Sequence, residues 1–224
     1  MRTVMITGAA GNLGRAVAAA FAGSAHVVLV DVKRGDLTDS GTQLFIETDL
    51  LKAESVQAAV AKTMQRFGRI DVLCNIAGGF RMGPPVHETT DKDWNVLLDL
   101  NARTVLNTAR AVVPVMLAAG GGKIINVGAY AAQKGAAQMG AYIAAKSAVI
   151  RLTETMAAEL REKNINVNCI LPTIIDTPEN RAAMPKADPT RWVAPEDLAN
   201  VIVFLASDEA RAIHGAALPV TGLS

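Results

Sequence analysis

The sequence predicts an α/β fold, a single doubly wound domain of the Rossmann type over residues 1–224, with a parallel sheet of about seven strands flanked by helices. Hydrophobic residues make up 50% of the chain but aromatic residues only 4%. The excess is therefore aliphatic, which is typical of buried parallel strands and the helices that cover them. Short apolar runs alternate with longer amphipathic runs along the whole chain, as in a doubly wound sheet. No repeat or linker divides it.

The first strand is expected at Arg2–Thr7, and a helix is expected to follow it in the sequence at Arg15–Ala22. The later strands are expected at His26–Val30, Gln43–Thr48, Ile70–Cys74, Lys123–Val127, Ile165–Leu171 and Ala216–Val220. The later helices are expected at Lys52–Phe67, Asp91–Ala119, Gly140–Lys163 and Glu196–Ala206. Residues 32–42 are too few for a crossover helix, so a trimmed connection is predicted there. Residues 173–195 are rich in Pro and are expected to cover a substrate.

Composition narrows the range of functions. The net charge is +1 and the basic residues are scattered, so neither nucleic acid nor a membrane surface is an expected partner. No signal peptide or apolar run of ~20 residues is seen. Cys74 and Cys169 lie in apolar runs, which favours reduced core residues and a cytoplasmic protein. His26, His87 and His214 are far apart in sequence, so no metal site is expected.

A glycine-rich loop joins the first strand to the first helix. It is interpreted as a Gly-x-x-x-Gly-x-Gly loop that binds a pyrophosphate, since glycines allow close approach and the helix N-terminus offers N–H groups. A flexible loop without a ligand is the alternative. The candidate residues are Gly8, Ala10, Gly11, Asn12, Leu13 and Gly14.

Asp31 ends the second strand, where a carboxylate can accept both ribose hydroxyls of adenosine and repel a 2′-phosphate. This favours NAD over NADP, as does the absence of a basic residue at Asn12. Lys33 and Arg34 point the other way, because either could reach a phosphate, and Asp31 could instead be a turn-forming cap. Asp49 and Leu50 follow the third strand and are candidates for contact with adenine.

Further candidates lie where later strands end, because the carboxyl ends of parallel strands meet at one edge of the sheet. Small residues there let a flat cofactor pass close to the backbone. These cofactor-binding candidates are Asn75, Ala77, Gly78, Val127, Pro172, Thr173 and Ile175.

Tyr142 and Lys146 stand four residues apart at the start of a long helical run, so both side chains lie on one face. A fixed ammonium beside a phenol lowers the phenol's pKa from ~10 and prepares it to exchange a proton. An exposed helix turn without a function is the alternative.

Together these motifs, with Asn101 in the long helix, resemble the short-chain dehydrogenase/reductase family from end to end. The resemblance implies an NAD(P)-dependent oxidoreductase in which Tyr142 gives or takes the proton. Lys146 would lower the pKa of Tyr142 and bind the nicotinamide ribose, and Asn101 would support a water relay to Lys146. Family members are commonly dimers or tetramers, so a homodimer or homotetramer is expected, with the helix at Gly140–Lys163 as a candidate interface.

One departure from the family pattern stands out. The family usually has a Ser thirteen residues before the Tyr, and that position is Ala129. Dihydropteridine reductases, a branch that lacks the Ser, are similar to this chain around Phe80, in Gly128–Lys146 and in Leu171–Trp192. That likeness implies an NADH-dependent reductase of a pterin-like or other conjugated acceptor, with Ala129, Phe80 and Trp192 at the substrate.

Two alternatives remain. One is a general alcohol dehydrogenase or ketone reductase of the 3-oxoacyl type, in which water, Tyr130 or a backbone N–H replaces the Ser. The other is a dinucleotide-sensing protein without catalytic activity. The intact Tyr142, Lys146 and Asn101 weigh against the sensing protein.

Overall fold

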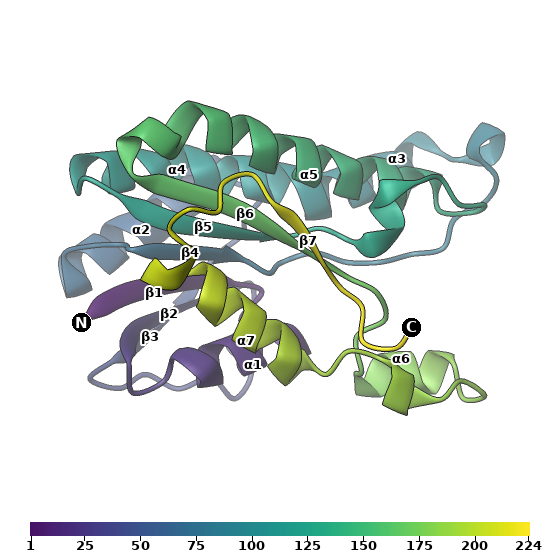
Figure 1. Cartoon of the computed structure of the whole chain (residues 1–224), viewed down its shortest axis with the longest axis horizontal. Coiled ribbons are helices and arrows are strands. Elements are labelled where there is room, and N and C mark those ends of the chain that lie inside the picture. The colour runs from purple at the N-terminus through teal and green to yellow at the C-terminus, as the bar shows by residue number, and fades with distance from the viewer.

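Seven parallel strands form one sheet with helices on both faces in the computed structural model, which describes all 224 residues (Figure 1). The strand order is β3-β2-β1-β4-β5-β6-β7. The strands are β1 (Arg2–Thr7), β2 (Ala25–Asp31), β3 (Gln43–Glu47), β4 (Val72–Asn75), β5 (Gly122–Val127), β6 (Ile165–Pro172) and β7 (Ala217–Val220). The predicted fold class is confirmed, and each expected strand is present.

Two helical layers cover the sheet. Helices α1 (Asn12–Phe21) and α7 (Pro195–Leu205) pack on one face, and α2 (Ala53–Phe67), α4 (Thr104–Ala118) and α5 (Gly140–Leu160) cover the other (Figure 1). Each layer has its own buried apolar cluster, because parallel strands bury side chains on both faces. None of the helices is both long enough and apolar enough to span a membrane.

The long helix expected at residues 91–119 is three pieces. Helix α3 (Asp91–Leu98) passes through a π-helical turn at Asp99–Arg103 into α4. A π turn inserts one residue per turn and is often found at functional sites. It contains Asn101, the residue expected to support a water relay to Lys146, and Asn101 is 1% exposed.

The trimmed connection between β2 and β3 contains no helix, as predicted. Its side chains protect the outer edge of β3 instead. A carboxylate oxygen of Asp39 accepts the backbone N–H of Phe45 at 2.6 Å, and the Arg34 guanidinium lies 4.7 Å from the centre of the Phe45 ring. A free strand edge is therefore occupied by the chain's own loop.

The order in which strands are added to the sheet reverses between β1 and β4. Strands β2 and β3 extend the sheet on one side of β1, and β4 begins the other side. Ligands of doubly wound sheets bind beyond the carboxyl ends of the strands at this point. Residues 173–194, which contain α6 (Pro178–Ala183), project beyond the same edge (Figure 1).

Candidate active site

The turn after β1 is built so that it lies against the turn after β4. Gly8 has a φ of +64°, and a Cβ there would come within 2.8 Å of the Ala77 backbone. The Thr7 hydroxyl accepts the N–H groups of Ile76 and Ala77 at 3.1 and 3.2 Å. The sequence did not mark Thr7 as a site residue; its only signal was a hydroxyl at the end of a buried strand.

The glycine spacing differs from the expected pattern. Glycines stand at 8, 11 and 14, so the place that the pattern gives to its second Gly is occupied by Asn12. Gly14 is required, because a Cβ there would lie 2.1 Å from the Gly8 carbonyl oxygen. Gly11 precedes α1 and has no side chain to cap it, so the first N–H groups of the helix are free for an anion.

Asp31 ends β2 beside this loop. Its two carboxylate oxygens accept the N–H of Ala10 at 3.0 Å and the N–H of Val32 at 2.7 Å. Arg15 on α1 is ion-paired with Asp36 in the next connection. One carboxylate is therefore fixed next to the loop, and the nearby guanidinium already has an anionic partner.

Tyr142 and Lys146 lie one turn apart on α5, as predicted, but no hydrogen bond joins their side chains. Lys146 is 5% exposed, and its Nζ donates to the Val127 carbonyl oxygen at 2.8 Å. Burial lowers the pKa of Lys146 to about 8. Burial also raises the pKa of Tyr142 to about 12, whereas sequence reasoning expected Lys146 to lower it. The expected direction is wrong, because the loss of hydration outweighs the effect of the ammonium, which is turned toward Val127.

Asn101 and Lys146 approach each other at Gly78. A Cβ on Gly78 would lie 2.9 Å from the Asn101 Oδ1 and 3.1 Å from the Lys146 Nζ. Asn101 brackets Gly79: its Oδ1 accepts the Gly79 N–H at 3.1 Å, and its Nδ2 donates to the Gly79 carbonyl at 3.0 Å. Asn101 therefore fixes the backbone of the turn after β4 directly beside Lys146.

Ala129 is 4% exposed and packs in an apolar cluster with Val149, Cys169 and Leu171. The next residue with a hydroxyl, Tyr130, is 43% exposed. Position 129, where the resemblance leads us to expect a Ser, is therefore apolar in its surroundings as well as in its side chain.

Two aromatic residues differ in their placement. Phe80 is 54% exposed and stands edge-on to the Tyr142 ring, with ring centroids 4.9 Å apart. Trp192 is 8% exposed, so its ring packs inside residues 173–195, here called the covering segment. The structure thus places Phe80 beside Tyr142 but gives no support to Trp192 as a second substrate-facing ring.

Other sequence candidates are only partly free for a ligand. The Asn75 side chain is 3% exposed and bonds to Asn126 and Thr108, so it fixes strands. The Thr173 hydroxyl bonds to the Thr221 carbonyl. Asp49 accepts the N–H of Leu51, and Leu50, Val127 and Pro172 are buried. Ile175 forms a β-bridge with Val193.

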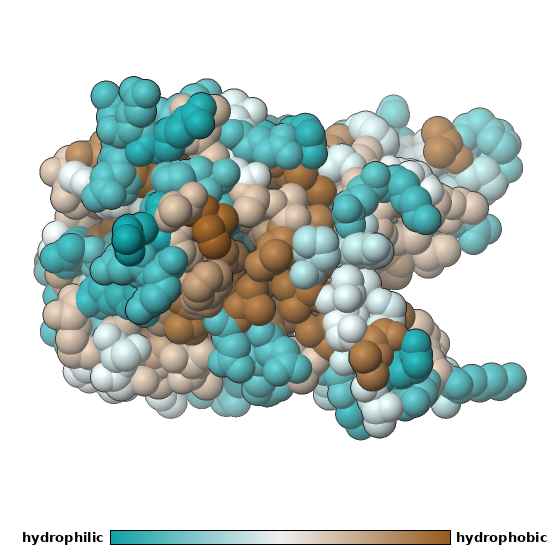
Figure 2. Space-filling model, in the orientation of Figure 1, coloured by the Kyte–Doolittle hydropathy of each residue, from teal (hydrophilic) through white to brown (hydrophobic).

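A hollow opens at the end of the molecule where α3 and α6 project. Figure 2 shows the molecular surface notched between the lobe that carries α3 and the lobe that carries α6. Tyr142 also lines a cavity under the turn after β4, together with Arg81, Met82, Thr89, Gln138 and Met139. A substrate can therefore approach the Tyr142 ring from the carboxyl edge of the sheet.

Sequence comparison identifies the family. A family profile described as enoyl-(acyl carrier protein) reductase matches residues 8–222. D-threitol dehydrogenase of Mycolicibacterium smegmatis is 35% identical, over 99% of this chain and 92% of that enzyme. The chain belongs to the short-chain dehydrogenase/reductase family. As a member of that family, it is an NAD(P)-dependent oxidoreductase.

Other relatives in the family are named for different substrates. The 3-oxoacyl-[acyl-carrier-protein] reductase of Thermotoga maritima is 33% identical, over 99% of this chain and 96% of the reductase. Among solved structures, carveol dehydrogenase from Mycobacterium avium in complex with NAD has a TM-score of 0.87 at 28% identity, over 99% of this chain and 96% of that one. NAD⁺-bound xylitol dehydrogenase has a TM-score of 0.89 at 28% identity, over 99% and 98%.

Proposed function

We propose that this short-chain dehydrogenase/reductase is an NADH-dependent reductase of a conjugated, pterin-like acceptor, for which quinonoid dihydropterin is the test compound. The observation that carries the proposal is Ala129, buried in an apolar cluster where the family pattern has a hydroxyl. The similarity of residues 128–146 and 171–192 to dihydropteridine reductases supports the same reading.

NAD is the proposed cofactor, and it supplies the hydride when bound in reduced form. The loop from Gly8 to Gly14 fits its pyrophosphate, because side chains would block that loop and the first N–H groups of α1 are free. Asp31 fits the adenosine ribose and disfavours a 2′-phosphate. NAD-bound carveol and xylitol dehydrogenases and an NAD-dependent glycerol dehydrogenase among the relatives agree with this choice.

Tyr142 is the proposed proton donor. A pKa raised to about 12 by burial keeps the phenol protonated at neutral pH, which suits reduction. Lys146 is protonated below pH 8 and would bind the nicotinamide ribose, while Asn101 holds the turn after β4 beside it. In these roles Tyr142 contacts the acceptor, and Asn101 positions backbone rather than relaying a proton directly.

The buried Ala129 decides between types of acceptor. A simple ketone concentrates negative charge on one oxygen during reduction, and loss of one hydrogen-bond donor to that oxygen lowers the rate by about 10²–10³. A conjugated C=N acceptor spreads the charge over its ring, so one donor from Tyr142 serves better there. Phe80, exposed and edge-on to Tyr142, offers an apolar side to a flat ring.

The second candidate is an alcohol dehydrogenase or ketone reductase. It is favoured by the relatives named D-threitol dehydrogenase and 3-oxoacyl-[acyl-carrier-protein] reductase. In that case water, a backbone N–H or Tyr130 replaces the missing hydroxyl.

The deciding experiment measures NADH oxidation with quinonoid dihydropterin and with a panel of ketones and polyols. We expect turnover of the pterin and a loss of about 10²-fold or more in kcat for Tyr142→Phe, which keeps the ring and removes the proton. A pterin rate equal to that of Tyr142→Phe rejects the proposal.

Ala129→Ser provides the matched control. We expect it to leave the pterin rate unchanged or lower, because a hydroxyl enters an apolar cluster. A rise of tenfold or more on a ketone, with no turnover of the pterin, assigns the second candidate instead.

The assembly proposed is a homodimer or homotetramer. Figure 2 shows apolar side chains gathered between α7 and β7, where Phe204 and Leu218 are 44% and 37% exposed. Helix α5 has no large apolar residue among the exposed ones, so the expected interface there has less support. The mass in solution, by light scattering, is the measurement.

A cytoplasmic location is also proposed. The two free, buried cysteines agree with it.

A further inference from the structure

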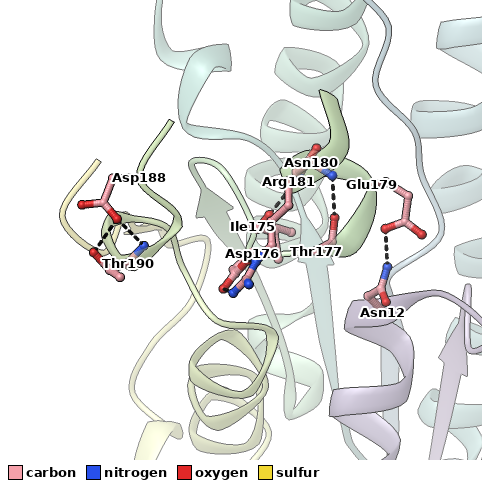
Figure 3. A network of polar contacts seen from close by, with 9 residues as sticks. All are labelled: Asn12, Ile175, Asp176, Thr177, Glu179, Asn180, Arg181, Asp188 and Thr190. Carbon is pink, nitrogen blue, oxygen red and sulfur yellow. Dashed lines mark hydrogen bonds and ion pairs between the residues drawn. The ribbon is translucent and has the colours of Figure 1, made fainter. Parts of the chain in front are cut away.

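One side-chain hydrogen bond joins the covering segment to the glycine loop. The Asn12 Nδ2 donates to the Glu179 Oε2 at 2.9 Å, between residues 167 positions apart (Figure 3). Asn12 is the first residue of α1, and Glu179 lies in the first turn of α6. The other side-chain bonds of residues 173–192 stay within the segment or reach the chain's C-terminal end. Among the side-chain hydrogen bonds of the segment, this one alone reaches the loop.

The carboxylate at this contact has no cationic partner. The hydrogen bonds from its own backbone and from Thr177 and Asn12 lower the pKa of Glu179, so it is ionised at neutral pH. The nearby Arg181 is already paired with Asp176 at 2.6 Å (Figure 3). The covering segment thus brings an uncompensated negative charge to the amino end of α1.

That end of α1 is also where the cofactor's pyrophosphate would lie. Gly11 leaves the helix without a side-chain cap, and the free N–H groups with the helix dipole attract an anion. The Asn12 side chain at this end of α1 donates to the Glu179 carboxylate. A pyrophosphate that enters meets a like charge held in place by Asn12.

We propose that Glu179 is a charge gate on cofactor binding, held closed over the glycine loop by Asn12. The proposal rests on the proposed NAD cofactor. The Glu179 carboxylate repels the pyrophosphate of the dinucleotide, so it weakens NADH binding and speeds release. Glu179 acts on affinity and takes no part in proton or hydride transfer.

The test is NADH affinity of Glu179→Gln, measured by fluorescence titration at low and high salt. Gln keeps the acceptor for Asn12 and removes the charge. We expect the dissociation constant to fall about fivefold at ~10 mM salt, as for one unit-charge repulsion across about 4 Å of water. The difference should shrink toward one at ~1 M salt, where the Debye length is about 3 Å.

Glu209→Gln is the matched control. It removes the same charge from an exposed position in the turn after α7, outside the glycine loop and the covering segment. We expect its NADH affinity to equal that of the wild type. A wild type that binds NADH while Glu179→Gln binds it equally or more weakly overturns the gate and leaves the cofactor proposal standing. A wild type that does not bind NADH overturns both.

Discussion

At the scale of single residues, the site is governed by burial. Tyr142 and Lys146 are both pushed toward their neutral forms, with pKa values of about 12 and about 8. The two side chains therefore do not share a proton. The two groups titrate in different pH ranges. The Tyr142 phenol keeps its proton at neutral pH, and the Lys146 ammonium loses its proton at about pH 8.

The loss of that proton predicts how NADH affinity depends on pH. Lys146 is the proposed contact to the nicotinamide ribose, and below pH 8 it is cationic and donates three hydrogens. We expect NADH affinity to fall as the pH rises through about 8. Titration of NADH binding from pH 6 to 10 is the measurement. Lys146→Met should bind NADH more weakly and show no inflection; an inflection that survives in this variant assigns the titration to another group.

At the scale of elements, four side chains form a polar chain across strands β4 and β5, on the face of the sheet that α4 and α5 cover. Thr108 donates to the Asn75 Oδ1, the Asn75 Nδ2 donates to the Asn126 Oδ1, and the Asn126 Nδ2 donates to the Thr153 hydroxyl, each at 2.8 Å. All four are buried. Val127 follows Asn126, so this chain fixes the strand end whose carbonyl accepts Lys146.

Thr153→Val tests the polar chain, because it leaves a buried Asn126 N–H without an acceptor. We expect a loss of about 1–3 kcal/mol in the free energy of unfolding, measured by urea denaturation. Thr63→Val is the control of equal burial, since the Thr63 hydroxyl bonds only to the Ala59 carbonyl of its own helix. That control should lose less than about 1 kcal/mol. Equal losses in the two variants would show that the hydrogen bonds of the polar chain add no stability.

The elements also show what the sequence could predict. Strand β2 was located because parallel strands are apolar on both faces, so Val27–Val30 appears as a continuous apolar run that Asp31 ends. The π turn around Asn101 was missed, since an extra residue only offsets the helical period and no Gly or Pro in Asp99–Arg103 marks the place. The Asn12–Glu179 bond was missed as well, because 167 residues separate two polar side chains with no local signal.

Site residues were predictable where a motif fixes them within a few positions. Tyr142 and Lys146 needed only the helical period, and Gly8 and Asp31 needed only a strand end. The direction of the Tyr142 pKa needed the three-dimensional environment, because burial is a property of the packed helix and not of the spacing. The burial of Trp192 also needed the three-dimensional structure, because nothing in its local sequence shows whether the ring is exposed or buried.

At the scale of the whole molecule, buried acids set the behaviour at high pH. Burial raises the pKa of Cys74 from 9.0 to about 12 and that of Cys169 to about 11, and Tyr142 shifts in the same direction. Above pH 9 the unfolded chain therefore releases protons that the folded chain keeps, so stability falls as the pH rises. Lys146 has the opposite sign between pH 8 and 10.5, because there the folded form holds fewer protons than the unfolded form.

Cys74 should contribute most to this loss of stability at alkaline pH, since its pKa rises from 9.0 to about 12. A difference of one in pKa corresponds to about 1.4 kcal/mol. Urea denaturation at a series of pH values from 8 to 11 is the measurement. We expect the free energy of unfolding of the wild type to fall more steeply above pH 9 than that of Cys74→Ala, by about 1.4 kcal/mol per pH unit. Cys74→Ala itself starts from a lower stability at pH 8, because it removes a buried sulfur from the core cluster, so the slopes rather than the absolute values are compared. Parallel slopes in the two proteins would place the alkaline loss on Tyr142 and Cys169 and would contradict a dominant role for Cys74.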